Sequence, residues 1–128
     1  MIVKTKQDVE GGKGDTILSG GNSHVLRYLL REDGVGFTVS DITVGPGGNK
    51  ILHYKNHIEA NLVIEGTGTV EDMASGEVHD LQPGTIYVLD KHDKHRLNAI
   101  TPLRVICVFT PPLVGGETHD EDGSYPLL

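Results

Sequence analysis

Residues that form tight turns recur along this chain at short, fairly even intervals. The sequence contains 17 glycines and 6 prolines, and the segments between them are short and rich in β-branched side chains. Turns are expected at Asp33-Gly34, at Gly45-Pro46-Gly47-Gly48, at Ser75-Gly76 and at Pro83-Gly84, because these residues accept tight or positive-φ geometry. Short strands separated in this way are typical of an all-β barrel or sandwich.

The residues between the turns predict nine strands and one short helix. The helix is expected near the N-terminus, around Thr5–Val9. The strands are expected near Val25–Arg31, Phe37–Val44, Ile51–Tyr54, Ala60–Glu65, Gly68–Glu71, Val78–Leu81, Thr85–Leu89, Arg96–Ala99 and Leu103–Phe109.

Two of these strands carry information on packing. From Leu103 onward both alternating rows of side chains are largely apolar, so this strand is expected to be covered on both sides. In Phe37–Val44 the apolar residues change parity partway along, which predicts a bulge or bend near Ser40-Asp41.

The chain length and the absence of repeats predict one domain over residues 1–128, large enough to bury one core. The last stretch, Pro111–Leu128, is rich in Pro, Gly and acidic residues. It is therefore expected to be an extended tail that lies outside the core.

Charge and cysteine content narrow the partners and the location. The net charge of −7 comes without a basic stripe, so nucleic acid and anionic membranes are not expected as partners and a small molecule is. No apolar run approaches the roughly 18 residues needed to span a bilayer, and Met1–Lys4 leads directly into polar sequence. Together with the single cysteine, Cys107, this predicts a cytoplasmic protein without internal disulfides.

Two segments have the spacing of the two sequence motifs of cupins. In the first, Gly47 is followed at the motif's intervals by His53, Lys55, Glu59 and Gly66. The first and third of the usual metal-binding positions are thus a histidine and a glutamate, but lysine replaces the second histidine. A protonated lysine cannot ligate a metal ion.

In the second motif, Gly84 leads to His95 at the expected spacing, with Asp90 and His92 in place of the usual proline and glycine. Glu59 and His95 therefore occupy positions at which cupins place metal ligands on facing strands. The chain resembles the cupins, whose fold is a double-stranded β-helix, or jelly-roll, barrel.

A metal ion held by Glu59 and His95 alone would be weakly bound, so a third ligand is needed. The candidates within reach are His53, His57 and Tyr87. An oxygen-rich set favours iron, with zinc as the alternative. The competing interpretation is that the glutamate and histidine are relics of a lost metal site, and that Tyr87 is a packing residue with a hydrogen-bonded hydroxyl.

Five segments resemble one cupin family, the ectoine synthases. They are His53–Ala60, Ile64–Gly68, Pro83–His95, Phe109–Leu113 and Gly116–Leu127. The last two have no counterpart in cupins generally, so they are the most specific part of the resemblance. The likeness extends from about Val25 to the end of the chain.

The resemblance implies a cytoplasmic hydro-lyase that makes a compatible solute under osmotic stress and forms a head-to-tail homodimer. The reaction is the iron(II)-dependent closure of N-γ-acetyl-L-2,4-diaminobutyrate to the cyclic amidine ectoine, with loss of water. The implied metal ligands are Glu59, Tyr87 and His95. The implied catalytic residues are Tyr54, His57, Glu117 and His119, with Glu117 or His119 as the base, and the substrate pocket is implied to include Arg27, Ser40, Ile42, Cys107 and Phe109.

Three positions depart from the family. Ser23 stands in place of a tryptophan, Ser40 in place of an asparagine, and Ile42 in place of a threonine. Ser40 and Ile42 share one face of their strand. If that face points inward, an alkyl group replaces a hydroxyl in the pocket, which is expected to change substrate recognition.

Three other functions remain open at this point. One is a related cyclase that acts on a different N-acyl diamino acid. Another is a non-catalytic metal-binding cupin that senses or sequesters a small amino-acid-like ligand. An oxygen-using iron cupin is disfavoured, because Lys55 does not complete a triad of two histidines and one carboxylate.

Overall fold

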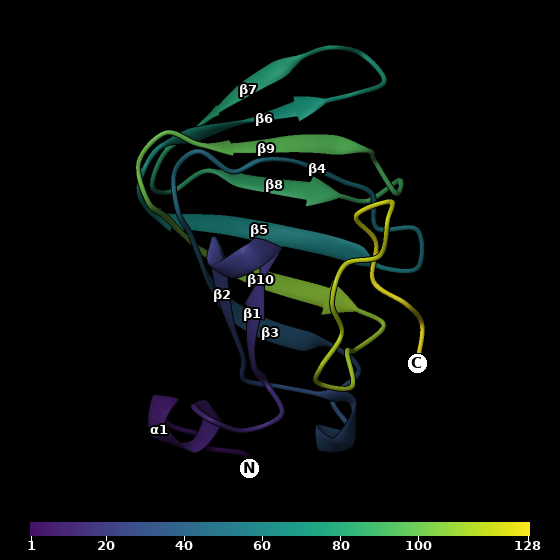
Figure 1. Cartoon of the computed structure of the whole chain (residues 1–128). Coiled ribbons are helices and arrows are strands. Elements are labelled where there is room, and N and C mark those ends of the chain that lie inside the picture. Colours follow the sequence, from purple (N-terminus) through teal and green to yellow (C-terminus); the bar gives the residue numbers. More distant parts are fainter.

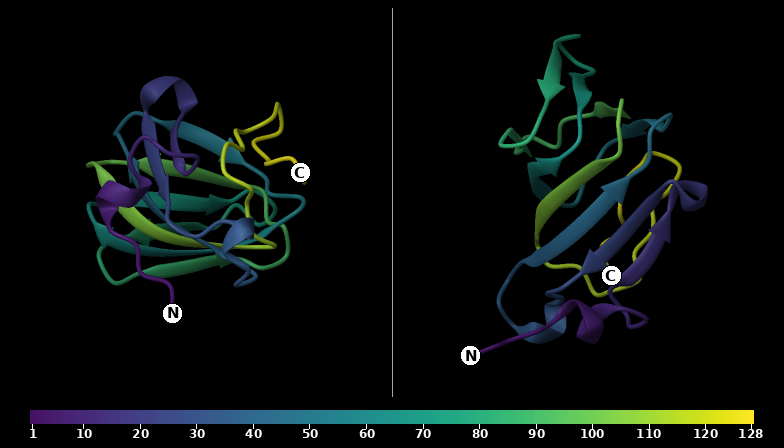
Figure 2. Two further views of the ribbon diagram at one scale, coloured as in Figure 1. Left: turned by 90° about the horizontal axis from the view of Figure 1, so that it is seen from below. Right: turned by 90° about the vertical axis from the view of Figure 1, so that its left-hand side faces the viewer.

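In the computed structural model, which describes residues 1–128, the strands form two antiparallel sheets that face each other (Figures 1 and 2). The larger sheet has the order β1-β2-β3-β10-β5-β8 and the smaller has the order β4-β9-β6-β7. The helix is α1 (Lys6–Val9), and the strands are β1 (Asp15–Leu18), β2 (Ser23–Arg27), β3 (Thr38–Val44), β4 (Asn49–Leu52), β5 (Ile58–Glu65), β6 (Gly68–Asp72), β7 (Val78–Leu81), β8 (Ile86–Leu89), β9 (His95–Ala99) and β10 (Leu103–Thr110). This arrangement confirms the predicted all-β cupin barrel.

The predicted strands are confirmed, with ends displaced by a few residues, but β1 was missed. Its sequence has two adjacent apolar residues and no alternation, and Ile17 is exposed on the outside. The first predicted strand also ends early, at Arg27, because the chain then turns through a short 3₁₀ helix at Arg31–Asp33. The predicted helix is confirmed, and the Thr5 hydroxyl accepts a hydrogen bond from the Asp8 backbone N–H at its start.

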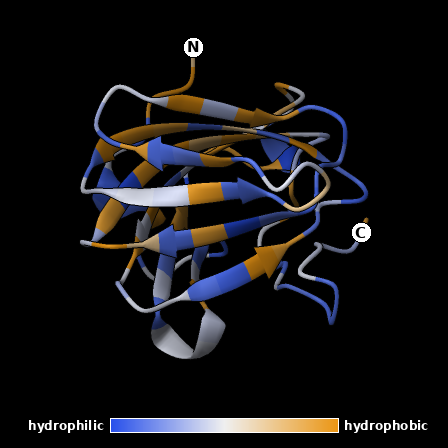
Figure 3. Cartoon of the chain, turned by 90° about the horizontal axis from the view of Figure 1, so that it is seen from above, coloured by the Kyte–Doolittle hydropathy of each residue, from blue (hydrophilic) through white to orange (hydrophobic).

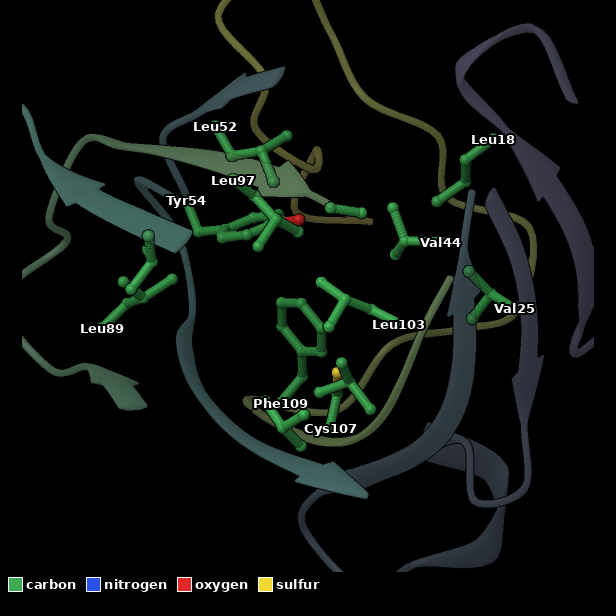
Figure 4. Packing of buried hydrophobic residues seen from close by; sticks show 14 of the residues in the cluster. Leu18, Val25, Val44, Leu52, Tyr54, Leu89, Leu97, Leu103, Cys107 and Phe109 are labelled. Atoms are coloured by element: carbon green, nitrogen blue, oxygen red, sulfur yellow. The ribbon is translucent and has the colours of Figure 1, made fainter. Parts of the chain in front are cut away.

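Side chains from both sheets point toward one core (Figure 4). The inward row of β10 is buried along its whole length, from Leu103 through Val105 and Cys107 to Phe109. Hydrophobic and hydrophilic residues alternate along many of the strands (Figure 3). Burial of this core supplies the main stabilisation of the barrel.

The predicted bulge near Ser40-Asp41 is wrong. β3 pairs without a register shift with β2 on one side and with β10 on the other. The apolar parity changes because Thr38 and Ser40 are polar residues that face inward, whereas Val39 is an apolar residue that faces outward. The register shift of this sheet lies elsewhere, at Arg104/Val105 opposite β5.

The expectation that β10 is covered on both sides is also wrong for the single chain. Its outward residue Val108 is 37% exposed, and Ile106 is only partly buried. The outward side chains Ala60 and Leu62 of the neighbouring strand β5 are apolar as well. The second apolar row therefore belongs to an open face of the sheet.

The C-terminal tail, Pro111–Leu128, has no regular secondary structure, as predicted, but it does contribute to the core. Leu113 and Tyr125 are fully buried within the core cluster. The tail runs across one end of the barrel (Figure 1): Leu113 N–H donates to the Thr38 hydroxyl of β3, and the Gly123 carbonyl accepts from His53 N–H just after β4. It therefore connects the two sheets. Nothing in the chain forms a helix with the length and apolar character needed to cross a membrane.

Candidate active site

A small hollow of about 40 Å³ lies inside the barrel, between the two sheets. Among the residues predicted from the sequence, the wall contains Ile42, Tyr54, Glu59, Tyr87, Cys107 and His119. The remaining wall is mostly apolar and includes Leu18, Val44, Leu52, Leu97 and Val105.

The predicted metal ligands come from three strands. Asn61 of β5 pairs with Tyr87 of β8, so Glu59, which is two residues before Asn61, lies diagonally across from Tyr87 on the same inward face. His95 begins β9 in the opposite sheet and, with Tyr87, lines a hollow that adjoins the first. The His95 Nδ1 atom lies 2.9 Å from the Asp93 carbonyl oxygen, and its Nε2 atom is buried without a hydrogen-bond partner.

No three His, Cys, Asp or Glu side chains come together closely enough to hold a metal ion. Neither His53 nor His57 therefore completes a site with Glu59 and His95. Of the candidates for a third ligand, only Tyr87 shares walls with both of these residues. Tyr87 lines one hollow with Glu59 and the adjoining hollow with His95.

Burial controls the protonation of these groups. Burial raises the pKa of Glu59 to about 7, while hydrogen bonds with Asn61 and Cys107 act in the opposite direction. Burial and the nearby Glu59 carboxylate also raise the pKa of the Tyr87 phenol well above its ordinary value. A cation between them would favour both ionised forms, because it supplies the charge that burial penalises.

His119 is held by aromatic neighbours at the wall of the cavity. Its Nε2 atom lies 2.8 Å from the Tyr54 hydroxyl, and its ring stacks on Tyr125 with centroids 4.6 Å apart. Burial, followed by the charges of Lys50 and Arg27, lowers the pKa of His119 to about 4. The imidazole is therefore neutral near pH 7.

Arg27 and Glu117 do not line the cavity; they organise the tail. The Arg27 guanidinium donates to the Gly115 and Glu117 carbonyl oxygens and lies 5.2 Å from the centre of the Tyr125 ring. The Glu117 carboxylate accepts from the backbone N–H groups of Val114 and Gly115, at 2.7 and 2.8 Å. Of the two predicted bases, only His119 reaches the cavity.

Three more predicted residues, Ser40, His57 and Phe109, lie behind the wall. All are buried, and Phe109 packs edge-on against Tyr54 with ring centroids 5.1 Å apart. His57 makes edge contacts with Phe109 and Tyr125. The Ser40 hydroxyl is buried without a partner.

The cavity also contains three polar residues that neither the motifs nor the family resemblance indicated. They are Asn61, Lys50 and Tyr125. Asn61 follows Glu59 by two residues and Lys50 precedes the buried Leu52 by two, so strand alternation was the available signal. Tyr125 lies in the irregular tail, where no periodicity could indicate its position.

The departures from the ectoine synthase pattern are concentrated at this cavity. Ser23 and Ile42 both line it, and Ser40 lies beside them on the inward face of β3. Ile42 points into the barrel, as the strand parity predicts. Asn61 adds an amide whose oxygen accepts from the Cys107 thiol at 2.8 Å and whose Nδ2 is buried without a partner.

Comparison with known proteins agrees with this geometry. The family model described as ectoine synthase matches residues 1–128. An L-ectoine synthase from Desulfatibacillum aliphaticivorans is 47% identical and one from Oceanobacillus iheyensis is 49% identical, each over 100% of this chain and 98% of the relative.

Solved structures give the same result. The crystal structure of ectoine synthase from P. lautus superposes with a TM-score of 0.81 at 40% identity, covering 90% of this chain and 81% of that one. A cupin domain of a transcriptional regulator from Enterobacter cloacae matches with a TM-score of 0.58 at 19% identity, covering 71% of this chain and 98% of that one, which supports the fold alone. With the family model matching from the first residue to the last, the chain belongs to the ectoine synthase family.

Proposed function

We propose that this protein is a hydro-lyase that closes N-γ-acetyl-L-2,4-diaminobutyrate to ectoine with loss of water. The observation that carries this proposal is the full-length family match combined with a cavity that brings Tyr54, Glu59, Tyr87 and His119 together. The substrate is a small, polar molecule, and a half-apolar cavity with a few convergent polar groups is suited to it.

The same proposal includes a metal ion, iron(II) with zinc as the alternative, bound by Glu59, Tyr87 and His95. The buried, unpartnered Nε2 atom of His95 supports this, because a buried ring nitrogen without a partner is costly unless something binds it. The mixed oxygen and nitrogen donors suit iron. When bound, the ion supplies Lewis acidity toward the amide carbonyl of the substrate.

His119 acts as the base in this proposal. The substrate α-amine must lose a proton before it can attack the amide carbon, and His119 is the one predicted base that lines the cavity. The Tyr54 hydroxyl is hydrogen-bonded to His119 Nε2 and so orients the imidazole. Cys107, in the cavity wall, and Phe109, behind it, are both buried and close this side of the cavity.

The tail supplies the closed environment that a dehydration requires. Tyr125 and His119 form part of the cavity wall, and Arg27 fixes the tail through its carbonyl groups. A closed wall holds the amine and carbonyl together and excludes bulk water, whose return would favour the open-chain substrate. We assign Arg27 and Glu117 to positioning the tail.

A second candidate function is favoured by Ile42. Because Ile42 lines the cavity where the family has a threonine, the preferred substrate can be a related N-acyl diamino acid with more apolar surface at that point.

We further propose a cytoplasmic homodimer. Support for the dimer comes from the outward face of β3, β10, β5 and β8. One cross-strand row is formed by Val39, Val108, Ala60 and Val88, and the next contains Ile106, Leu62 and Ile86. An exposed apolar face of this kind usually marks an interface. The cytoplasmic location is supported by Cys107, which is a free and buried thiol.

The test is direct turnover. Purified protein, loaded with iron(II) under anaerobic conditions, is incubated with N-γ-acetyl-L-2,4-diaminobutyrate, and ectoine is quantified by chromatography. The proposal expects ectoine formation that falls about 100-fold or more in His119→Gln. Substrate binding by the iron-loaded protein without any ectoine would contradict the proposal and favour a non-catalytic binding cupin.

A further inference from the structure

Lys50 lies at the mouth of the cavity. It is on β4, where it shares the inward face with the buried Leu52 two residues later. Its side chain lines the cavity on one side and, on the other, a polar hollow at the surface formed by Ser19, Asn22, Pro46, Gly47 and Gly48. Lys50 therefore stands between the interior and solvent.

The Lys50 ammonium has no counter-ion. No Asp or Glu oxygen lies within 4.0 Å of it, whereas Lys4, Lys6, Lys13 and Lys55 each have an acidic partner at or below that distance. Its one side-chain hydrogen bond is donated to the Ser23 hydroxyl. An ammonium has three donors, so two remain for another acceptor.

Lys50 is also the only lysine or arginine in the cavity wall. Arg27, the nearest rival in the interior, is committed to the tail carbonyls and to Tyr125. His119 is neutral near pH 7. If the ligand carries an anionic group, Lys50 is the one positive charge in the wall that can meet it.

Holding the Lys50 ammonium in a half-buried position costs free energy. Burial lowers the pKa of Lys50, because a partly desolvated ammonium without a partner is disfavoured. A solvated surface lysine, the ordinary alternative, would not be held between two hollows with its side chain bonded to a buried serine. Ser23 itself is 3% exposed.

We infer that Lys50 and Ser23 form an anion site that binds the α-carboxylate of the substrate. The inference rests on the proposed function and deepens it, since neither residue was among the predicted ligands or catalytic residues. The ammonium supplies the charge, and the Ser23 hydroxyl supplies a second donor and holds the ammonium in place.

A carboxylate bound to Lys50 would also orient the substrate for the proposed reaction. Lys50 and His119 line the same cavity. In an α-amino acid the amine is attached to the carbon next to the carboxylate. A carboxylate on Lys50 would therefore bring the amine toward His119, while the acetamide at the opposite end of the molecule extends toward Glu59 and Tyr87.

The test combines a change in the protein with the matching change in the ligand. The kcat/KM of the iron-loaded enzyme is measured for N-γ-acetyl-L-2,4-diaminobutyrate and for its α-carboxamide, using wild type, Lys50→Met and Lys50→Arg. Lys50→Met is expected to lower kcat/KM for the carboxylate about 10- to 100-fold, chiefly through KM, because charged hydrogen bonds contribute this much. For the carboxamide the change is expected to stay below about threefold, and Lys50→Arg is expected to restore much of the loss.

Two controls distinguish a specific anion site from a general effect of charge removal or of misfolding. Lys6→Met removes a lysine whose side chain is 69% exposed and is expected to leave both substrates unaffected. Thermal unfolding of Lys50→Met is expected to show no loss of stability, because an unpaired, half-buried charge has been removed. Equal losses for carboxylate and carboxamide, or no loss for either, would overturn the assignment.

Failure of the proposed function can be recognised separately. If wild type forms no ectoine, calorimetric titration of the same iron-loaded proteins with N-γ-acetyl-L-2,4-diaminobutyrate measures the site without turnover. A 10-fold or greater rise in Kd for Lys50→Met then supports the anion site even though the cyclase proposal has failed. An unchanged Kd overturns it.

Discussion

Ile42 is the cavity residue whose chemistry bears most directly on the choice of substrate. It pairs with Val105 across β3 and β10, and both side chains line the cavity. An alkyl group at this point offers no hydrogen bond to a polar substrate. Other single side chains, Tyr87 and His119, determine metal binding and proton transfer in the proposed reaction.

Replacing Ile42 by threonine should therefore improve the ectoine reaction. We expect Ile42→Thr to raise kcat/KM for N-γ-acetyl-L-2,4-diaminobutyrate roughly 5- to 10-fold, because one hydrogen bond contributes about 1 kcal/mol. Steady-state ectoine formation measures this. The matched control is Val105→Thr, which puts a hydroxyl on the neighbouring strand β10 and should bring no gain. Robust wild-type turnover that Ile42→Thr does not improve would show that this residue does not limit recognition.

Tyr87→Phe removes only a hydroxyl and tests the proposed third ligand. We expect the iron content of anaerobically purified protein to fall below about half of the wild-type value, since two remaining ligands bind weakly. Elemental analysis measures the content, and circular dichroism checks the fold. Tyr125→Phe is the control, because its hydroxyl belongs to the same cavity wall but not to the ligand set. Equal iron in both variants would exclude Tyr87 as a ligand.

The lowered pKa of His119 predicts a pH-dependent stability. The folded protein holds this pKa at about 4, against an ordinary value of 6.5. Between these values the unfolded chain binds a proton that the folded chain does not. The free energy of unfolding must therefore fall as the pH drops from about 6.5 toward 4, by up to about 3 kcal/mol from this group.

The His119→Gln variant lacks this contribution, so it should lose less stability than wild type between pH 7 and pH 5. Urea unfolding at the two pH values measures the difference. Glu59, whose raised pKa of about 7 acts with the opposite sign in the same window, is present in both proteins and cancels in the comparison. Identical losses in both proteins would contradict the lowered pKa.

At the scale of elements, the buried guanidinium of Arg27 is one of the groups that attach the tail to the barrel. We expect Arg27→Met to lower the free energy of unfolding by about 2–3 kcal/mol and to make the tail susceptible to proteolysis, since bonds from a charged donor are lost. Limited proteolysis and urea unfolding measure the two effects. Arg31→Met is the control, because Arg31 reaches only the exposed Leu128 carbonyl. Similar behaviour of both variants would show that Arg27 does not anchor the tail.

At the scale of the whole molecule, the outward apolar rows of the larger sheet predict a dimer. Light scattering at micromolar concentration should give twice the chain mass of 13.8 kDa. Leu62→Glu places a charge in the centre of that face and should yield monomers. Ile100→Glu is the control, since Ile100 is 60% exposed but lies in the turn between β9 and β10. A wild-type monomer would contradict the dimer, and a dimeric Leu62→Glu would move the interface elsewhere.

The sequence by itself determined most of the elements and the motif positions of this protein. Turn residues and β-branched segments are local signals, so every strand except β1 followed from them. Motif spacing likewise indicated Glu59 and His95, because alternation and strand length decide which residues of facing strands point inward.

Only the tertiary structure decided which inward residues reach the cavity. Lys50, Asn61 and Ile42 line it, whereas Ser40 and Phe109 are inward but lie behind the wall. Period-two alternation assigns a side chain to a face and says nothing about where two sheets leave space between them. The false bulge in β3 has the same origin: polar residues that face inward and apolar residues that face outward invert the parity that local reasoning assumes. The tail, without periodicity, acquired its place in the core solely through contacts with strands distant in the sequence.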